Sequence, residues 1–299
     1  MTKAQKLAAG LQGDDLYAAL RSAAAGLSEA EAEALPGAIL AAATPAVRAR
    51  LQAVDAGLLR AVVRRGAGFA ATRSEAAVRA WLAEAAVAPL FEPEICSTSH
   101  LALLTGGQHP DMPAFSDRRF DGWFKARGVR YGLGPYGEAR TIYATDQFAD
   151  AASPERRTRH LGIDVFAPVR TAVHAPLAGR VAFVRYNADP LDYGHTLILE
   201  HDTGSGRFWT LYGHLAGSLP GFCAVGDRVA AGQQIAHLGD WHENGGWAAH
   251  VHFQVMTDML AQTGGNFFGV GHASLWDVWQ GICIDPNLIL RLPESCFVL

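Results

Sequence analysis

Two histidines separated by a single valine, His250 and His252, lie in the apolar run AAHVHFQVM at 248–256. The run predicts a buried strand, and side chains alternate faces along a strand, so both imidazoles are expected on one face, about 6.6 Å apart. Imidazoles are common metal ligands and general bases at neutral pH. An isolated pair of this kind more often marks satisfied or solvent-facing histidines, so the interpretation depends on ligand-type residues elsewhere in the chain.

Further candidates precede this strand. His160 and Asp164 lie in RHLGIDVFAP, and His214 ends the strand-like run LYGHL. In an extended strand, His160 and Asp164 would be about 13 Å apart, but Gly162 between them permits a bend. Two histidines and a carboxylate form a ligand set of catalytic zinc, with a fourth position left for water. The pattern alone does not decide which histidine of the H-x-H pair binds the metal.

The elements that must position these residues fall into three regions. Residues 1–93 are rich in Ala, Leu, Arg and Glu, with a capping box at Ser28 and Glu31, and predict an all-α region. Residues 94–158 are aromatic and glycine-rich, and predict an irregular connecting segment that packs on the rest. Residues 159–299 begin with short strands and glycine turns, which predict an antiparallel β domain, and end in a helical tail. The expected fold class is therefore α+β.

Composition excludes several classes of protein. Hydrophobic residues make up 49% of the chain and charged residues 18%, so a globular core is expected, and the net charge of −4 offers no basic footprint for nucleic acid or a membrane surface. No apolar stretch reaches the length of about 18 residues that a membrane span needs. The first twenty residues lack the apolar region of a secretory signal, which predicts a cytoplasmic protein. The four cysteines are scattered and predict reduced thiols rather than a zinc site.

Five motifs occur in order between about residues 159 and 256: HLGIDVFAP, VHAPLAGRV, YGHL, VGDRVAAGQQIAHLG and HVHF. In these motifs the chain resembles the lysostaphin/LytM-type zinc metallopeptidases, which cleave peptidoglycan cross-bridges. The resemblance implies a two-sheet antiparallel core with a groove that holds one zinc ion. By the same resemblance, the zinc ligands are His160, Asp164 and His252, and the catalytic histidines that do not bind the metal are His214 and His250.

The expected reaction follows from zinc chemistry. Zinc lowers the pKa of a bound water towards 7 and polarises the carbonyl of an amide. His214 or His250 would take up the proton of the water, and the sequence does not assign the two roles. The main hypothesis is a zinc-dependent amide hydrolase. The alternatives are a zinc enzyme with a non-hydrolytic step on a small amine-containing metabolite, a peptidoglycan endopeptidase exported by an unrecognised route, and a binding module that activates another hydrolase. Retention of all five site residues argues against the binding module.

The chain also departs from the family pattern. Trp241, His242 and Trp247 occupy the loop before the H-x-H strand and are predicted to line the groove and contact the substrate. Gln254 stands where the family commonly has glutamate, and Arg170 where it commonly has glycine. Since no export signal is visible, we expect a small peptide or amide as substrate. The helical region is either a structural cap or a binding surface for a protein partner.

One prediction concerns access to the groove. The aromatic stretch Trp123–Tyr143 should pack on the apolar surface around Trp241 and Trp247, cover part of the groove and restrict it to small substrates. The basic run RRTR at 156–159 precedes the first metal-ligand candidate. It is interpreted as a solvated loop, with carboxylate binding as the alternative.

Overall fold

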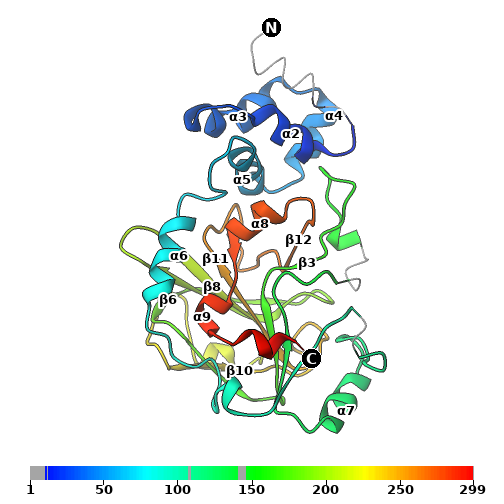
Figure 1. Ribbon diagram of the computed structural model, residues 1–299, viewed down its shortest axis with the longest axis vertical. Helices are drawn as coiled ribbons and strands as arrows, with labels where there is room; N and C mark the ends of the chain where they lie inside the picture. Colours follow the sequence, from blue (N-terminus) through cyan, green and yellow to red (C-terminus); the bar gives the residue numbers. More distant parts are fainter. Residues whose placement is uncertain (1–10, 12, 107–108, 141–145, 299) are drawn as a thin grey trace.

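In the computed structural model, the helices before residue 67 lie at one end of the molecule, the helix at residues 75–84 lies beside the sheet, and a large β-sheet fills the other end (Figure 1). The structure describes residues 11, 13–106, 109–140 and 146–298. The N-terminal helices are α2 (Leu16–Ala24), α3 (Glu29–Ala42), α4 (Pro45–Gln52), α5 (Ala56–Gly66) and α6 (Glu75–Glu84). The predicted capping box is present at the start of α3, where Ser28 and Glu31 satisfy each other's backbone N–H groups. No helix in the described part of the chain is long and apolar enough to cross a membrane.

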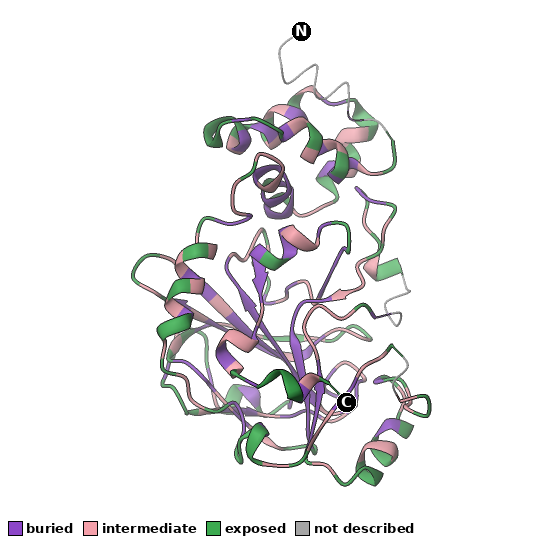
Figure 2. Ribbon diagram, viewed as in Figure 1, coloured by how far each residue is buried: buried purple, intermediate pink, exposed green. Residues whose placement is uncertain are grey.

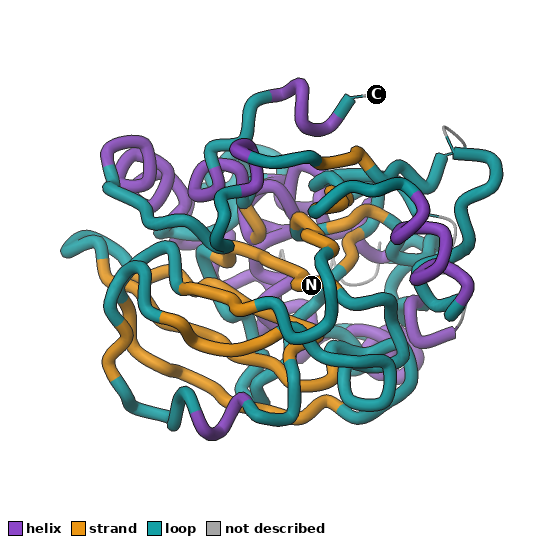
Figure 3. Tube along the Cα trace, turned by 90° about the horizontal axis from the view of Figure 1, so that it is seen from below, coloured by secondary structure: helices purple, strands orange, loops and turns teal. Residues whose placement is uncertain are grey.

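The main sheet has nine strands and is antiparallel except between β1 and β2. Its path is β1 (His100–Ala102), β2 (Tyr131–Gly134), β4 (Ile163–Phe166), β11 (His250–Met256), β8 (Arg207–Leu215), β7 (Gly194–Asp202), β6 (Gly179–Asn187) and β9 (Arg228–Val229), with β13 (Cys283–Ile284) paired to β11. Two strand pairs lie outside it: β5 (Ala172–His174) with β10 (Gln234–His237), and β3 (Arg159–His160) with β12 (Val270–Gly271). The α+β class and the mostly antiparallel sheet are confirmed. Viewed from the end opposite the N-terminal helices, the strands form much of the front of the molecule (Figure 3).

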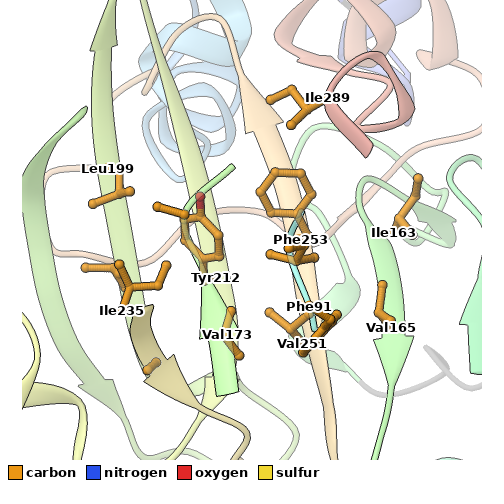
Figure 4. Close-up of a cluster of buried hydrophobic side chains, with 14 of the residues drawn as sticks. Phe91, Ile163, Val165, Val173, Leu199, Tyr212, Ile235, Val251, Phe253 and Ile289 are labelled. Carbon is orange, nitrogen blue, oxygen red and sulfur yellow. The ribbon is translucent and has the colours of Figure 1, made fainter. Parts of the chain in front are cut away.

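One face of the main sheet builds the larger hydrophobic core. Val251 and Phe253 of β11 point into it, and Val173 and Ile235 of the β5–β10 pair close it from the other side (Figure 4). Helix α6 packs on the same core through Val78. The alternation of β11 therefore directs its odd-numbered side chains into this core, and His250, His252 and Gln254 lie on the opposite face.

A second core joins the N-terminal helices to the opposite face of the sheet. Met256 and Leu211 of the sheet belong to one buried cluster with Val62 of α5 and Trp279 of α8 (Trp276–Ile282). Strands β4, β7, β8 and β11 are buried along most of their length, whereas β6 is mostly half-buried or exposed and the outer surfaces of the helices are exposed (Figure 2). The helical region is thus continuous with the sheet core in its packing, as a structural cap would be.

The connecting segment is more regular than predicted. It contributes strands β1 and β2 to the sheet, helix α7 (Arg119–Ala126) and two short 3₁₀ helices, η1 (Ile95–Ser97) and η2 (Asp146–Phe148). The short sequence YGLG of β2 alternates two residues of the larger core, Tyr131 and Leu133, with two glycines, and antiparallel pairing with β4 fixes its extended form. The remaining elements are η3 (Leu219–Gly221), α9 (Asn287–Leu290) and η4 (Glu294–Phe297), the last two forming the C-terminal tail.

Candidate metal centre and active site

Strand pairing and one glycine bring the two ends of the H-x-x-x-D motif to the H-x-H strand. His252 of β11 lies directly opposite Asp164 of β4 in the antiparallel register. Between β3 and β4 the chain bends out of the extended conformation. This bend brings the side chain of His160 next to those of Asp164 and His252. A Cβ added to Gly162 would lie 2.6 Å from Cε1 and Nε2 of His252. Only glycine therefore lets this turn approach the imidazole so closely.

The three predicted ligand residues form a compact triangle of polar atoms. His160 Nε2 lies 3.0 Å from His252 Nδ1 and 3.2 Å from Asp164 Oδ1. His252 Nδ1 lies 3.0 Å from the same carboxylate oxygen. All three side chains are buried. In the described part of the chain, this is the group of histidine and acidic side chains whose atoms converge closely enough to hold one metal ion.

Hydrogen bonds on the far side of each ring fix which nitrogen carries the proton. His160 Nδ1 donates to the carbonyl oxygen of Pro135 at 2.9 Å, because a carbonyl can only accept. His252 Nε2 donates to Oε1 of Gln254 at 2.8 Å. The orientation of Gln254 follows from its amide nitrogen, which donates to the carbonyl of Phe268 at 3.0 Å. His160 Nε2 and His252 Nδ1, the two nitrogens that face each other, therefore carry a lone pair and no proton.

The triangle is thus built from acceptors alone. Two imidazole nitrogens and a carboxylate oxygen meet at about hydrogen-bond distance, and the hydrogen bonds on the outer sides of the rings leave no proton between them. Burial and the charge of Arg140 lower the pKa of His160 to about 4, which keeps its ring neutral at pH 7. A bound cation would remove the repulsion between these three acceptor atoms. Nitrogen and carboxylate ligands backed by such hydrogen bonds suit zinc.

Arg140 holds the carboxylate ligand from behind. Its Nη1 donates to Oδ2 of Asp164 at 2.7 Å, and its Nε donates to Oε2 of Glu138 at 2.8 Å. Burial would raise the pKa of Asp164, but its electrostatic interactions with His160 and Arg140 outweigh burial and hold that pKa well below its usual range. The carboxylate therefore stays ionised although the side chain is only 3% exposed. Sequence reasoning missed Arg140, which lies in no motif.

An unusual backbone conformation brings His214 to the same face of the sheet. Alternation from Tyr212, which packs in the core on the opposite face, would place His214 in that core as well. Instead, β8 carries one extra residue in this region, because Leu215 pairs with His195 while Tyr212 pairs with Leu197. His214 adopts a left-handed φ of 63° in this bulge. The bulge reverses the direction of its side chain.

His214 and His250 then form a pair of proton acceptors beside the triangle. Their ring centroids are 4.3 Å apart. His214 Nδ1 donates to the carbonyl of Asn244 at 2.8 Å, and His250 Nδ1 donates to that of Ala248 at 2.7 Å, so both Nε2 atoms carry lone pairs. His250 Nε2 lies 3.8 Å from Asp164 Oδ1. Burial lowers the pKa of His250 to about 4 and that of His214 well below its usual range, so both rings are neutral at pH 7.

The sequence that carries this geometry, residues 158–263, matches Peptidase family M23. This part of the chain is an M23 peptidase domain. No curated protein matches the chain as a relative. The match supports a hydrolase of the metallopeptidase class for this domain, and it includes all five residues of the triangle and the histidine pair.

Solved structures give weaker likenesses to the chain. A zinc-containing peptidase from Vibrio cholerae is 30% identical over 33% of this chain and 28% of that one, with a TM-score of 0.28. The catalytic domain of the antimicrobial peptidase lysostaphin from Staphylococcus simulans is 22% identical over 57% of this chain and 97% of that one, with a TM-score of 0.35. The chain thus spans about a quarter of the length of the Vibrio peptidase, and the domain assignment depends on the sequence match.

A cavity of about 340 Å³ opens beside the histidines of the M23 domain. Trp247, one of the predicted substrate-contacting residues, lines it. Trp241 does not: its ring is buried, and its Nε1 donates to Oδ2 of Asp121 in α7 at 2.7 Å. His242 also lies outside the lining, with 68% of its side chain exposed. The structure therefore places one of the three predicted contact residues at the cavity.

The connecting segment packs beside the cavity, in part with the residues predicted: Trp123 and Phe124 pack on the apolar cluster that contains Trp241 and Trp247. Phe115 and Phe120 form one apolar cluster with Trp241 and Trp247. Of the predicted cover, Trp123–Tyr143, residues 131–134 instead form the sheet strand β2, and residues 141–143 lie outside the described part of the chain. The residues of the connecting segment that line the cavity are Phe115, Arg140, Gln147, Phe148 and Arg157. The prediction is therefore confirmed for Trp123, Phe124 and Arg140, and it is wrong for residues 131–134 because β2 pairs with β4.

Two further residues complete the site and were not predicted. Tyr193 lines the cavity, with its hydroxyl 3.4 Å from His252 Nε2. Asn244, whose carbonyl holds His214, is fully buried, and its amide nitrogen donates to the carbonyl of Trp247 at 2.8 Å. An asparagine before two glycines is a turn signal that points to Asn244, whereas Tyr193 has no such signal.

The departure at Arg170 has a structural basis. Its φ of 68° lies in the left-handed region that favours glycine. Its Nη1 contacts Oε1 of Glu243 at 2.6 Å, and the other oxygen of Glu243 accepts from the backbone N–H of Gly217 at 2.7 Å. The ion pair connects Arg170 to the loop that carries Asn244.

Proposed function

We propose that this chain is a zinc-dependent peptidase or amide hydrolase that acts on short peptides. His160, Asp164 and His252 hold one zinc ion. The observation that carries this proposal is the triangle of three acceptor atoms, 3.0–3.2 Å apart, which has no proton to stabilise it. A zinc ion bound there would act as a Lewis acid and lower the pKa of water towards neutrality.

The chain's own residues supply the proton transfers. The neutral Nε2 atoms of His214 and His250 both face the site, so one of them accepts the proton of the attacking water. The imidazolium that forms is the acid that protonates the leaving amine. Because backbone carbonyls hold both Nδ1–H groups, the rings keep this orientation throughout. The hydroxyl of Tyr193 lies in the same cavity and can donate to the oxygen of the attacked carbonyl.

The size and lining of the cavity favour a small substrate. About 340 Å³ is at the lower end of small-molecule sites. Its walls include Phe115, Trp247, Phe267 and Phe268, with polar groups between them. This supports a short peptide or amide over a polymer.

Metal analysis and peptide hydrolysis on matched variants test the proposal. Asp164→Ala should lose stoichiometric zinc yet remain folded. His214→Ala and His250→Ala should keep zinc and lose activity by about two to four orders of magnitude. His237→Ala, which removes a histidine of β10, should change neither property.

Three results would contradict the proposal in separate parts. A full zinc equivalent in Asp164→Ala would exclude the ligand set. Loss of zinc in His250→Ala alone would exchange the roles of His250 and His252. Normal turnover in both His214→Ala and His250→Ala would exclude the proton-transfer mechanism.

A further inference from the structure

Four charged side chains other than the candidate zinc ligand line the cavity, and they differ in what already engages them. Arg140 donates to two carboxylates, those of Asp164 and Glu138. The carboxylate of Asp192 accepts from the backbone N–H of Tyr193 at 2.7 Å and from Asn266, and Asp189 is exposed. The remaining one is Arg157, the second arginine of the RRTR run.

Arg157 keeps most of its donors free. Its Nη2 donates to the carbonyl of Gln147 at 2.8 Å and its Nη1 to that of Ala149 at 3.3 Å. A guanidinium has five N–H groups, so three have no hydrogen-bond partner among the described residues. The nearest carboxylate oxygen, Oδ2 of Asp150, is 3.8 Å away and accepts from the hydroxyl of Tyr17. The charge of Arg157 is therefore only partly balanced, although its side chain is just 13% exposed.

Arg157 is also connected to the candidate metal centre, through contacts of Phe268. Its guanidinium carbon lies 5.3 Å from the centre of the Phe268 ring, which holds its plane. The carbonyl of the same Phe268 accepts from Gln254, the residue that orients His252. The cavity that Arg157 lines is the one that His214 and His250 line. A ligand group on Arg157 would therefore share one small chamber with the reacting atoms.

The neighbouring arginines of the run lie in other surroundings. Arg156 is exposed and pairs with Asp146 at 2.7 Å. Arg159 donates from Nη1 to the carbonyl of Gly137 at 3.1 Å. Neither is among the residues that line the cavity. The interpretation as a solvated loop fits Arg156 and does not fit Arg157.

We propose that Arg157 binds the free carboxylate at the end of the substrate, so that the enzyme removes residues from the carboxyl terminus of short peptides. This rests on the proposed peptidase function. A planar guanidinium with spare parallel donors matches a carboxylate, and low exposure strengthens the pair. In the reaction, one water adds across the amide: the C–N bond breaks, the acyl carbon gains the water oxygen, and the proton goes to the amine. The leaving amine carries the carboxylate that Arg157 holds.

Matched substrates and variants test this assignment. The probes are N-acetylated di- and tri-alanines of L and D configuration, each as the free acid and as the terminal carboxamide. The zinc-loaded enzyme should prefer the acids in kcat/KM by about 10- to 100-fold, the usual value of a hydrogen bond to a charged group. Arg157→Gln should lose this preference, through a fall in kcat/KM on the acids that exceeds any change on the carboxamides. Arg157→Lys should keep part of it, and Arg156→Gln should keep all of it.

A binding measurement separates this inference from the peptidase function. Calorimetry with N-acetyl-alanine and its carboxamide reports on Arg157 without turnover. If no probe is hydrolysed but the acid binds more tightly than the amide, and Arg157→Gln abolishes the difference, the carboxylate site stands and the peptidase function falls. Equal rates and equal binding of acids and amides by the unmodified enzyme would overturn the inference. So would an equal loss on both probe types in Arg157→Gln with zinc content and folding intact.

Discussion

Gln254 should set zinc affinity although it is not a zinc ligand. Its Oε1 accepts from Nε2 of His252 at 2.8 Å, and its amide nitrogen donates to the carbonyl of Phe268 at 3.0 Å. The side chain is fully buried, so no water replaces it easily. The near-isosteric change Gln254→Leu removes this acceptor. We therefore expect the His252 ring to lose its preference for the tautomer in which Nε2 carries the proton and the Nδ1 lone pair points at the ion.

The magnitude follows from the loss of one partner of a buried donor. A buried N–H left without an acceptor costs about 1–3 kcal/mol. Since this N–H belongs to the ring that we propose as a zinc ligand, the cost should appear as a loss of zinc affinity of about 10- to 100-fold. Gln254→Glu, which keeps an acceptor facing His252, should retain most of the affinity.

Competition with a chromophoric chelator at pH 7 measures this effect on metal-free protein. Gln234→Leu is the matched control, because Gln234 also lies 3.0 Å from a histidine, His237, but on strand β10. Its zinc affinity should equal that of the unmodified protein. Unchanged affinity in Gln254→Leu, or an equal loss in Gln234→Leu, would refute the reasoning, provided that thermal melts show both variants folded.

Two further predictions concern the turn at the site and the pH dependence of stability. Gly162→Ala should weaken zinc binding strongly, because its Cβ would lie 2.6 Å from the ring of His252. The control Gly122→Ala in α7, whose Cβ meets nothing within 4 Å, should leave zinc affinity unchanged. Equal zinc affinities of the two variants would contradict this reasoning. Burial lowers the pKa of His201 to about 4, below its ordinary value of 6.5, so the stability it contributes is complete above pH 6.5 and is lost as pH falls towards 4. Denaturant titrations from pH 7 to 4 should show a smaller loss in His201→Gln, by up to about 3 kcal/mol, and identical pH profiles would exclude this origin.

Local periodicity was sufficient for much of the site. The period of two along a strand places His250 and His252 on one face whatever the rest of the fold does. The bend at Gly162 was predictable because glycine tolerates close approach. The helix start at Ser28 was also predictable, since capping depends on a few neighbouring residues, and the cap is present.

Contacts between distant segments decided the rest. The hydrogen-bond partner of each ring decides which nitrogen keeps its lone pair. Gln254 accepts from Nε2 of His252 and leaves the lone pair on Nδ1, whereas the carbonyl of Ala248 accepts from Nδ1 of His250 and leaves it on Nε2. The bulge at His214 depends on pairing between β7 and β8, which no local pattern encodes. Arg140 and Arg157 look like ordinary loop arginines in the sequence. Each acquires its role only because segments far apart in the chain bury it beside the cavity, where a charge must be matched by a carboxylate or a ligand.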